Sequence, residues 1–213
     1  MNSLLRLFFY GVLIRSIVLI VLGLHVRHRE RLPGGGPAII VANHNSHLDT
    51  MVLMSLFSLR LLPKLHPVAA MDYFLTSRLF SWFTLKVIGI LPIKRTVARG
   101  DNDPLAPCNK ALAEGRMLIV FPEGSRGEPE QLQRFKNGIA RLAEDNPAVP
   151  VIPVFLHGLG KALPKGEALL VPFFCDIFIG EPLLWTGERR AYMRQLDERM
   201  RQLADEGKFP AWE

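Results

Sequence analysis

The sequence predicts an α/β fold, a mixed and largely parallel sheet flanked by helices, with a membrane-associated helix at its N-terminus. Short apolar runs that are typical of buried strands alternate with segments of helical character between residues 38 and 156. Polar residues follow directly after several of these runs, and residues 4–24 are nearly all apolar. Strands that alternate with helices are typical of layered α/β domains.

The composition limits the class of protein. The chain has 213 residues, of which 49% are hydrophobic, and its mean hydropathy of +0.18 favours contact with a membrane. This length is enough for one domain with a sizeable core. Residues 1–99 hold 12 Lys or Arg against 3 Asp or Glu, whereas residues 100–213 hold 14 against 17. A basic, apolar first half fits a membrane surface, a phosphorylated ligand or an acidic carrier protein. Nucleic acid is not an expected partner, because no nucleic-acid-binding module is recognisable.

Residues 4–24 are expected to form a helix that associates with a membrane. About 20 apolar residues span a bilayer core, but a charged side chain near the middle, here Arg15, costs roughly 2.5–3.5 kcal/mol. We therefore expect a helix that lies in one leaflet while Arg15 reaches the headgroups, and a true span stays open. Arg27, Arg29 and Arg31 follow this helix. They favour an inner-membrane location with the following domain facing the cytoplasm.

The glycine-rich turn at residues 32–37 divides the chain into two predicted parts. Residues 1–31 hold the membrane-associated helix and its basic flank. Residues 32–213 form the main domain, in which residues 32–160 carry the motifs described below. Residues 161–213 are expected to be a C-terminal extension that contains a surface helix.

Hydrophobic periodicity and turn residues predict the elements of the main domain. Strands are expected at residues 38–42, 88–93, 117–121 and 149–156. Helices are expected at residues 51–62, 73–87, 108–114, 134–144 and 188–206. The last of these helices has one apolar stripe on an otherwise charged surface, which is typical of a helix packed on the outside of a domain.

The most informative motif is the block Asn43-His44-Asn45-Ser46-His47-Leu48-Asp49, which follows the apolar run at residues 38–42. His44 is therefore expected at a strand-to-helix turn, where its side chain can face a cleft. A histidine can take a proton from a hydroxyl, and a nearby carboxylate can hold its other nitrogen protonated. Ser46-x-x-Asp49 is also a capping box, which would make Asp49 a helix cap. Both interpretations can hold, since a capping carboxylate is rigid and can face back toward the turn.

A metal site is the alternative for the two histidines of this block. His44 and His47 form a potential pair of ligands, but no nearby Cys or further His has the spacing of metal ligands. Cys108 and Cys175 lie far apart and are expected to be reduced thiols. We therefore predict no metal site.

Two other predicted strands also end in polar residues. The run at residues 117–121 leads into Pro122-Glu123-Gly124-Ser125-Arg126-Gly127, where the glycines allow a tight turn. Arg126 offers a planar fork suited to phosphate, and the alternative is a surface turn with a Glu–Arg ion pair. The run Gly89-Ile90-Leu91-Pro92-Ile93-Lys94-Arg95 ends in cations, which form either a protective basic edge or a second arm of a phosphate clamp. Lys136 adds a cation at a helix start.

Together these blocks resemble the four ordered blocks of the glycerolipid acyltransferases, over roughly residues 32–160. The class that they resemble most is the 1-acylglycerol-3-phosphate O-acyltransferases of bacterial type. The His-x4-Asp pair becomes specific in combination with the Phe-Pro-Glu-Gly block at this spacing. The four blocks are His44-x4-Asp49, Gly89 to Arg95, Phe121-Pro122-Glu123-Gly124-Ser125-Arg126 and Val151-Ile152-Pro153-Val154.

The resemblance implies a role for each block. His44 would be the general base and Asp49 its orienting partner. Pro153 would lie near the acyl donor. Ser125 keeps the hydroxyl of the Thr that is more common in the family, whereas Pro92 and Lys94 replace a common aromatic residue and a common acid. The residues implied in binding the acceptor, chiefly its phosphate, are Arg95, Glu123, Gly124, Ser125, Arg126 and Lys136.

The implied reaction is acyl transfer from acyl-CoA or an acyl carrier protein to the hydroxyl of a lysophospholipid, in the first place 1-acylglycerol-3-phosphate, which gives phosphatidic acid. No cofactor besides this thioester co-substrate and no acyl-enzyme are expected. Another lysophospholipid or a lyso-aminolipid stays open as the acceptor. A non-catalytic lipid-binding protein is a further alternative, against which the intact His44 and Asp49 argue. The apolar segments 51–62 and 74–87 would either line an acyl tunnel or belong to the core.

Overall fold

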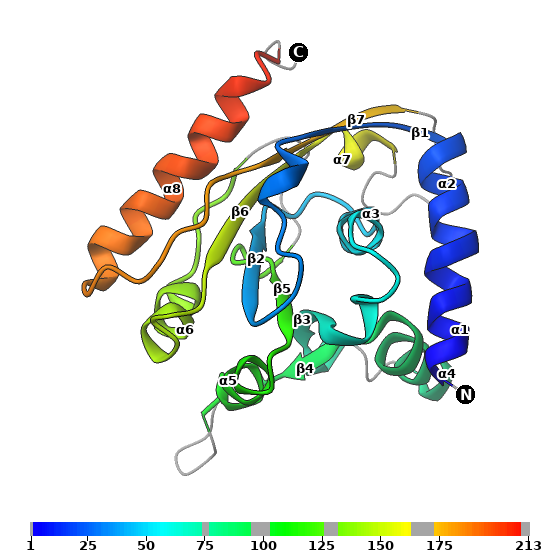
Figure 1. Cartoon of the computed structure of the whole chain (residues 1–213), viewed down its shortest axis with the longest axis horizontal. Coiled ribbons are helices and arrows are strands. Elements are labelled where there is room, and N and C mark those ends of the chain that lie inside the picture. Colours follow the sequence, from blue (N-terminus) through cyan, green and yellow to red (C-terminus); the bar gives the residue numbers. More distant parts are fainter. Residues whose placement is uncertain (1, 74–76, 95–102, 126–131, 163–172, 210–213) are drawn as a thin grey trace.

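The computed structural model of the chain describes residues 2–73, 77–94, 103–125, 132–162 and 173–209. Seven strands form one sheet with helices on both faces (Figure 1). Their order across the sheet is β1-β7-β6-β2-β5-β3-β4. In chain order the strands are β1 (Leu22–Arg27), β2 (Ala38–Ala42), β3 (Leu65–Ala70), β4 (Leu91–Ile93), β5 (Met117–Val120), β6 (Val151–His157) and β7 (Phe173–Ile179).

The sheet is mixed and largely parallel, which confirms the predicted fold class. Strands β6, β2, β5, β3 and β4 pair in parallel, whereas β7 runs antiparallel to β6 and β1 pairs in parallel with β7. All five residues of β2 are buried. Its continuous apolar run is what a central strand needs when helices cover both faces of a parallel sheet.

Alternate residues of the strands point into two separate cores. Ile40 of β2 faces one core, together with helices α2, α3 and α7, and Ile39 and Val41 face the other, together with α5, α6 and α8. Helix α1 lies beside the segment Thr84–Ile88, which continues α4, at the edge of the first layer (Figure 1). The helices are α1 (Asn2–Phe8), α2 (Arg15–Ile20), α3 (Leu48–Leu56), α4 (Arg78–Phe83), α5 (Ala106–Ala113), α6 (Gly138–Asp145), α7 (Leu159–Ala162) and α8 (Arg189–Glu206).

The N-terminal segment differs from the single helix expected over residues 4–24. A helix runs through α1, the π-helical segment Phe9–Ile14 and α2, and the chain then enters β1 in the sheet. Tyr10 and Ile14 are buried in the same core as the central strands. Residues 2–31 therefore share one sheet and one core with the main domain. Within the described ranges, no helix is both long enough and apolar enough to cross a membrane.

The arginines of this segment bind main-chain carbonyl groups of the α/β domain. The guanidinium of Arg15, which was expected to reach lipid headgroups, donates to a carbonyl at the C-terminal end of α3, where helix carbonyls lack partners of their own. Arg6 is buried against Gly89, where a Cβ would collide with the guanidinium. Arg6, Arg15, Arg29 and Arg31 donate to the carbonyl oxygens of Leu65, Phe57, Leu56 and Ile179 at 2.7, 3.1, 3.0 and 2.9 Å, respectively.

Several other elements have different bounds from those predicted. Helix α3 ends at Leu56 because Phe57 is extended, so the helix expected over residues 51–62 is shorter. In place of a helix over 73–87, α4 continues into the π-helical segment Thr84–Ile88, which closes at Gly89 with φ of +82°, and residues 74–76 lie outside the described residues. Strands β3 and β7 were not predicted. Short 3-10 turns occupy Arg29–Arg31, Leu62–Lys64 and Met71–Tyr73.

The C-terminal helix confirms its prediction closely. Helix α8 begins after Glu188, whose carboxylate caps it by accepting from the main-chain N–H groups of Arg190 and Ala191 at 2.9 and 2.8 Å. Its apolar stripe is buried against β6 and α6. An isolated apolar stripe on a charged helix leaves only one way to pack, so this element could be predicted from sequence alone.

Candidate active site

Two polar turns come together at one edge of the sheet. Strands β2 and β5 are parallel neighbours, so the residues that follow them lie side by side. His44 follows β2 and Glu123 follows β5, and the main-chain N–H of His44 donates to Oε2 of Glu123 at 3.3 Å. Open α/β sheets bind their ligands outside the carboxyl ends of the strands, which is where these turns lie.

His44 and Asp49 form a hydrogen-bonded pair. Nδ1 of His44 and Oδ2 of Asp49 are 2.9 Å apart, and the Asp49 side chain is fully buried in the first turn of α3. A carboxylate oxygen accepts, so Nδ1 carries the proton and Nε2 is the nitrogen that can take one from a substrate. The imidazole is 21% exposed, so the pair can be reached from solvent.

The carboxylate of Asp49 also binds the turn before α3, although the N-cap of the helix is His47 and not Ser46. Besides the imidazole, Oδ2 of Asp49 accepts from the main-chain N–H groups of Asn45 and Ser46 at 2.7 and 2.8 Å. The Ser46 hydroxyl oxygen accepts from the N–H of Leu48 at 3.2 Å. One carboxylate oxygen therefore binds both the turn before α3 and the imidazole of His44.

Two residues outside the predicted site set also hold His44. The ring of Phe121 stacks on the imidazole, with centroids 4.2 Å apart and planes 23° from parallel. Asn43 is buried, and its side chain both donates to and accepts from the main chain of Leu156, at 2.8 and 2.7 Å. A buried amide must find partners, so a polar residue at the end of an apolar strand was a usable signal for Asn43. The stacking of Phe121 on His44 could be predicted only from the pairing of β2 with β5, which the sequence does not reveal.

Glu123 is only 4% exposed, and its side chain lies against the turn that contains His44. Its Oε1 accepts from the main-chain N–H of Gln133 at 3.4 Å, and its Oε2 accepts from His44 as described above. Burial raises the pKa of Glu123 to about 7, although the hydrogen bonds from Gln133 and His44 act in the opposite direction. The carboxyl group therefore titrates near neutral pH.

The exposed part of this second turn carries a cation. Gly124 has φ of +78°, and a Cβ there would collide with the amine end of the Lys136 side chain, so Lys136 lies across the glycine. The N–H of Lys136 donates to the carbonyl of Pro122 at 2.9 Å, which fixes this approach. Ser125 is exposed next to Gly124. The structure thus brings Gly124, Ser125 and Lys136 together beside His44 and Glu123.

The remaining predicted residues lie elsewhere. Arg95 and Arg126 are outside the described residues. Lys94 is exposed directly after β4, at the same edge of the sheet as His44. Pro153 is buried in the middle of β6, beside Val41 of β2, so it belongs to the sheet interior.

Metal binding is the alternative prediction for His44 and His47. His47 is exposed, while Nδ1 of His44 is engaged by Asp49. Among the residues that the structure describes, no group of three or more His, Cys, Asp or Glu side chains is arranged to hold a metal ion. What the structure shows at His44 is a buried carboxylate hydrogen-bonded to Nδ1 of a partly exposed imidazole.

The raised pKa of Glu123 predicts how stability depends on pH. The folded state holds the proton more tightly than the unfolded chain, so between pH 4.5 and about 7 stability falls as pH rises. The full change is about 3 kcal/mol in order of magnitude. Urea unfolding at pH 5 and pH 8 should show a larger loss of stability for the wild type than for Glu123→Gln, and an equal loss in both proteins would contradict the burial of this carboxyl group.

The fold and this pair define the class of protein: an α/β domain with a carboxylate-bound histidine at the carboxyl edge of its sheet. The sequence profile of the acyltransferase family matches residues 23–157. The chain belongs to the acyltransferase family.

Relatives with assigned activities agree with this membership. A chloroplastic 1-acyl-sn-glycerol-3-phosphate acyltransferase of Arabidopsis thaliana is 32% identical over 162 residues, which are 75% of this chain and 43% of that protein. A 1-acyl-sn-glycerol-3-phosphate acyltransferase of Pseudomonas aeruginosa is 28% identical over 182 residues, covering 82% of this chain and 64% of that protein. The chain therefore spans less than two thirds of either relative.

The fold has also been solved in another protein. The crystal structure of the 1-acyl-sn-glycerophosphate acyltransferase PlsC from Thermotoga maritima superimposes with a TM-score of 0.76 at 21% sequence identity. The match covers 98% of this chain and 80% of that chain. The likeness at this identity establishes the architecture, including the mixed sheet and its flanking helices.

Proposed function

We propose that this protein transfers an acyl group from acyl-CoA or an acyl carrier protein to the hydroxyl of 1-acylglycerol-3-phosphate and forms phosphatidic acid. The observation that carries the proposal is the 2.9 Å hydrogen bond between His44 and the buried Asp49, beside the turn of Glu123 and Gly124. The activity named for the Arabidopsis and Pseudomonas relatives supports this choice of acceptor.

The geometry supports direct transfer without an acyl-enzyme. The acceptor hydroxyl gives its proton to Nε2 of His44 while its oxygen forms a bond to the thioester carbonyl carbon. The carbon–sulfur bond then breaks, and the thiol leaves with a proton returned by the imidazolium. Asp49 stabilises the imidazolium between these steps. General-base catalysis of this kind contributes about 10²–10⁴-fold, and positioning supplies much of the remainder.

The acceptor would be recognised by the exposed residues of the turn that follows β5. A phosphate would meet the amine of Lys136 where it crosses Gly124, with the Ser125 hydroxyl next to it. By resemblance to the family, Arg126 and Arg95 would complete a cationic surface for the phosphate. This assignment favours an acceptor with a terminal phosphate monoester over a neutral or zwitterionic lipid.

Thiol release with purified protein tests the proposal. Oleoyl-CoA is supplied with 1-acylglycerol-3-phosphate, with lysophosphatidylcholine, with a lyso-aminolipid, or without acceptor. We expect release that depends on 1-acylglycerol-3-phosphate and yields phosphatidic acid. The same panel is run with acylated carrier protein as donor. Turnover with a different lyso-lipid alone would contradict the proposed acceptor, and release that needs no acceptor would contradict transfer.

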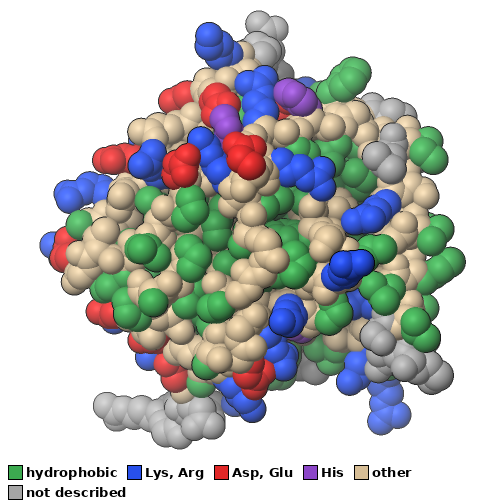
Figure 2. Space-filling view, viewed as in Figure 1, with side chains coloured by type: hydrophobic (Ala, Val, Ile, Leu, Met, Phe, Trp, Pro, Cys, Tyr) green, Lys and Arg blue, Asp and Glu red, His purple; other side chains and the backbone are tan. Residues whose placement is uncertain are grey.

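We also propose that the protein docks on the cytoplasmic face of the inner membrane through its N-terminal helices. Helices α1 and α4 and the neighbouring segments expose many apolar side chains, and hydrophobic atoms line the edge of the molecule where α1 and α2 lie (Figure 2). Exposed apolar surface of this kind is typical of contact with lipid or a partner. The exposed residues are Leu4, Leu5, Phe8, Val12, Leu13, Ile20, Leu79, Phe80, Trp82 and Leu85.

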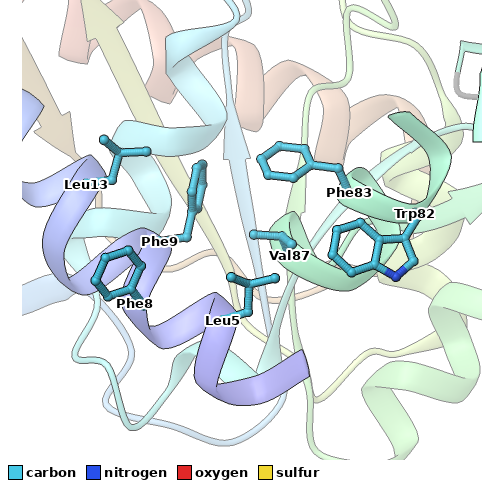
Figure 3. Close-up of a pocket in the computed structure, with 7 residues that line it drawn as sticks. All are labelled: Leu5, Phe8, Phe9, Leu13, Trp82, Phe83 and Val87. Carbon is cyan, nitrogen blue, oxygen red and sulfur yellow. The ribbon is translucent and has the colours of Figure 1, made fainter. Parts of the chain in front are cut away.

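An apolar cavity lies within this face, between α1 and α4 (Figure 3). Its volume is about 310 Å³, and its walls are the side chains of Leu5, Phe8, Phe9, Leu13, Trp82, Phe83 and Val87. The rings of Phe9 and Phe83 meet edge to face at 5.3 Å. Part of the segment expected to line an acyl tunnel, residues 74–87, therefore lines this cavity. In α3, by contrast, Val52, Leu53 and Met54 are fully buried core.

Substitution on this face is expected to weaken binding to lipid. Phe8 and Leu79 are 63% and 82% exposed, so replacing both with Asp should leave the fold intact. Loss of one buried large apolar side chain costs about 1.5–3 kcal/mol, so binding should weaken at least about 10-fold. Leu184→Asp is the control, because Leu184 is 54% exposed and lies in the segment between β7 and α8. Cosedimentation with anionic vesicles measures both, and equal binding of the two variants would contradict docking through this face.

A further inference from the structure

We propose that Glu123 is a positioning residue, which fixes the main chain of His44 and does not itself bind the acceptor. Its carboxylate joins three segments: the turn after β5, the turn after β2, and the chain just before α6. Oε2 accepts from the N–H of His44 at 3.3 Å, and Oε1 accepts from the N–H of Gln133 at 3.4 Å. Both oxygens are thus directed at main-chain amides.

The burial of Glu123 separates it from the residues that can meet a substrate. Glu123 is 4% exposed, whereas the next two residues, Gly124 and Ser125, are exposed. Its oxygens could accept further hydrogen bonds, but the burial of the side chain keeps a lipid hydroxyl away from them. Recognition of the acceptor therefore belongs to the exposed side of the turn, where Lys136 crosses Gly124.

Held this way, His44 is fixed from three directions. Asp49 holds the imidazole, Glu123 holds the main-chain N–H, and the preceding Asn43 is tied to the main chain of Leu156 in β6. A general base works only within hydrogen-bonding distance of the hydroxyl that it deprotonates. Misplacement by about 1 Å can cost about 10²-fold in rate. Glu123 therefore acts on catalysis through the placement of His44.

Steady-state kinetics separate positioning from binding. This part of the test rests on the proposed acyl transfer, and it is run at pH 8, where the carboxyl group of Glu123 is ionised. Glu123→Gln should lower kcat by about 10- to 100-fold while the KM for the acceptor changes by less than about twofold. Lys136→Ala is the contrasting variant and should chiefly raise the acceptor KM. A raised acceptor KM with unchanged kcat in Glu123→Gln would overturn the proposal.

Hydrogen exchange at single amides tests the same assignment without any substrate. Glu123→Ala removes both acceptor oxygens and should lower the protection of the His44 and Gln133 amides by at least about 10-fold. The Asn45 and Ser46 amides are internal controls, since Asp49 binds them. Equal loss at all four amides, or no loss at any, would overturn the proposal. Selective loss at His44 and Gln133 in a protein without acyl transfer would support positioning and reject the proposed function.

Discussion

Replacement of His44 by alanine is expected to lower kcat for acyl transfer by about 10²–10⁴-fold, the range that general-base catalysis contributes. The imidazole is partly exposed, and its contacts are the hydrogen bond to Asp49 and the stacking on Phe121. The main-chain bond to Glu123 does not depend on the side chain. The variant should therefore fold normally and keep its affinity for the acceptor. Acceptor-dependent thiol release at saturating substrate measures the loss.

His47→Ala is the matched control for this prediction. His47 lies three positions later in the same turn and is exposed, so its loss should leave kcat within about threefold of the wild type. The comparison also tests the metal alternative, because a metal bound by both histidines would make the two variants equally inactive. A His44→Ala protein that retained more than about a tenth of the wild-type kcat would contradict the role of His44 as base.

The central strands could be predicted because a strand that is buried on both faces needs a continuous run of apolar residues. Strands β2, β5 and β6 are covered on both faces, so their residues form short apolar runs between turns. Strand β1 was hidden because it directly continues an apolar helix, and uniform apolarity does not distinguish strand from helix. The alternation of Leu22, Leu24 and Val26 with smaller or polar residues was the one local signal for it.

In the candidate site, too, contacts between residues close in the sequence could be predicted, and contacts between distant segments could not. His44 and Asp49 are five residues apart, and the geometry of one turn brings them together, so their pairing could be predicted. The bond between Glu123 and His44 exists because β5 lies next to β2, which sequence alone does not establish. Arg15 was expected to reach lipid headgroups because it is a charged residue in an apolar segment. In the folded chain it donates to the main-chain carbonyl of Phe57 at the end of α3.

Substitution of Asp49 should have the second large effect, and its size should depend on the replacement. Oδ2 of Asp49 accepts from the N–H groups of Asn45 and Ser46 as well as from His44. In Asp49→Asn, the N–H groups of Asn45 and Ser46 favour the side-chain orientation that places the oxygen, and not the NH2 group, where Oδ2 was. His44 therefore keeps the tautomer with its proton on Nδ1. The imidazolium loses its counter-charge, and we expect kcat to fall about 10²-fold with the fold retained.

Asp49→Ala removes the acceptor for all three donors. We expect kcat to fall further than in Asp49→Asn, to the level of His44→Ala, because the imidazole is no longer oriented. Two buried N–H groups lose their partner, which costs at least about 2 kcal/mol of stability and lowers Tm by roughly 4–8 °C. Asp103→Ala is the matched control, since Asp103 also accepts a main-chain hydrogen bond, from Leu105 at the start of α5, far from His44 in the sequence. That variant should lose stability and keep its kcat. Equal activity of Asp49→Asn and Asp49→Ala would contradict the orienting role of the carboxylate oxygen.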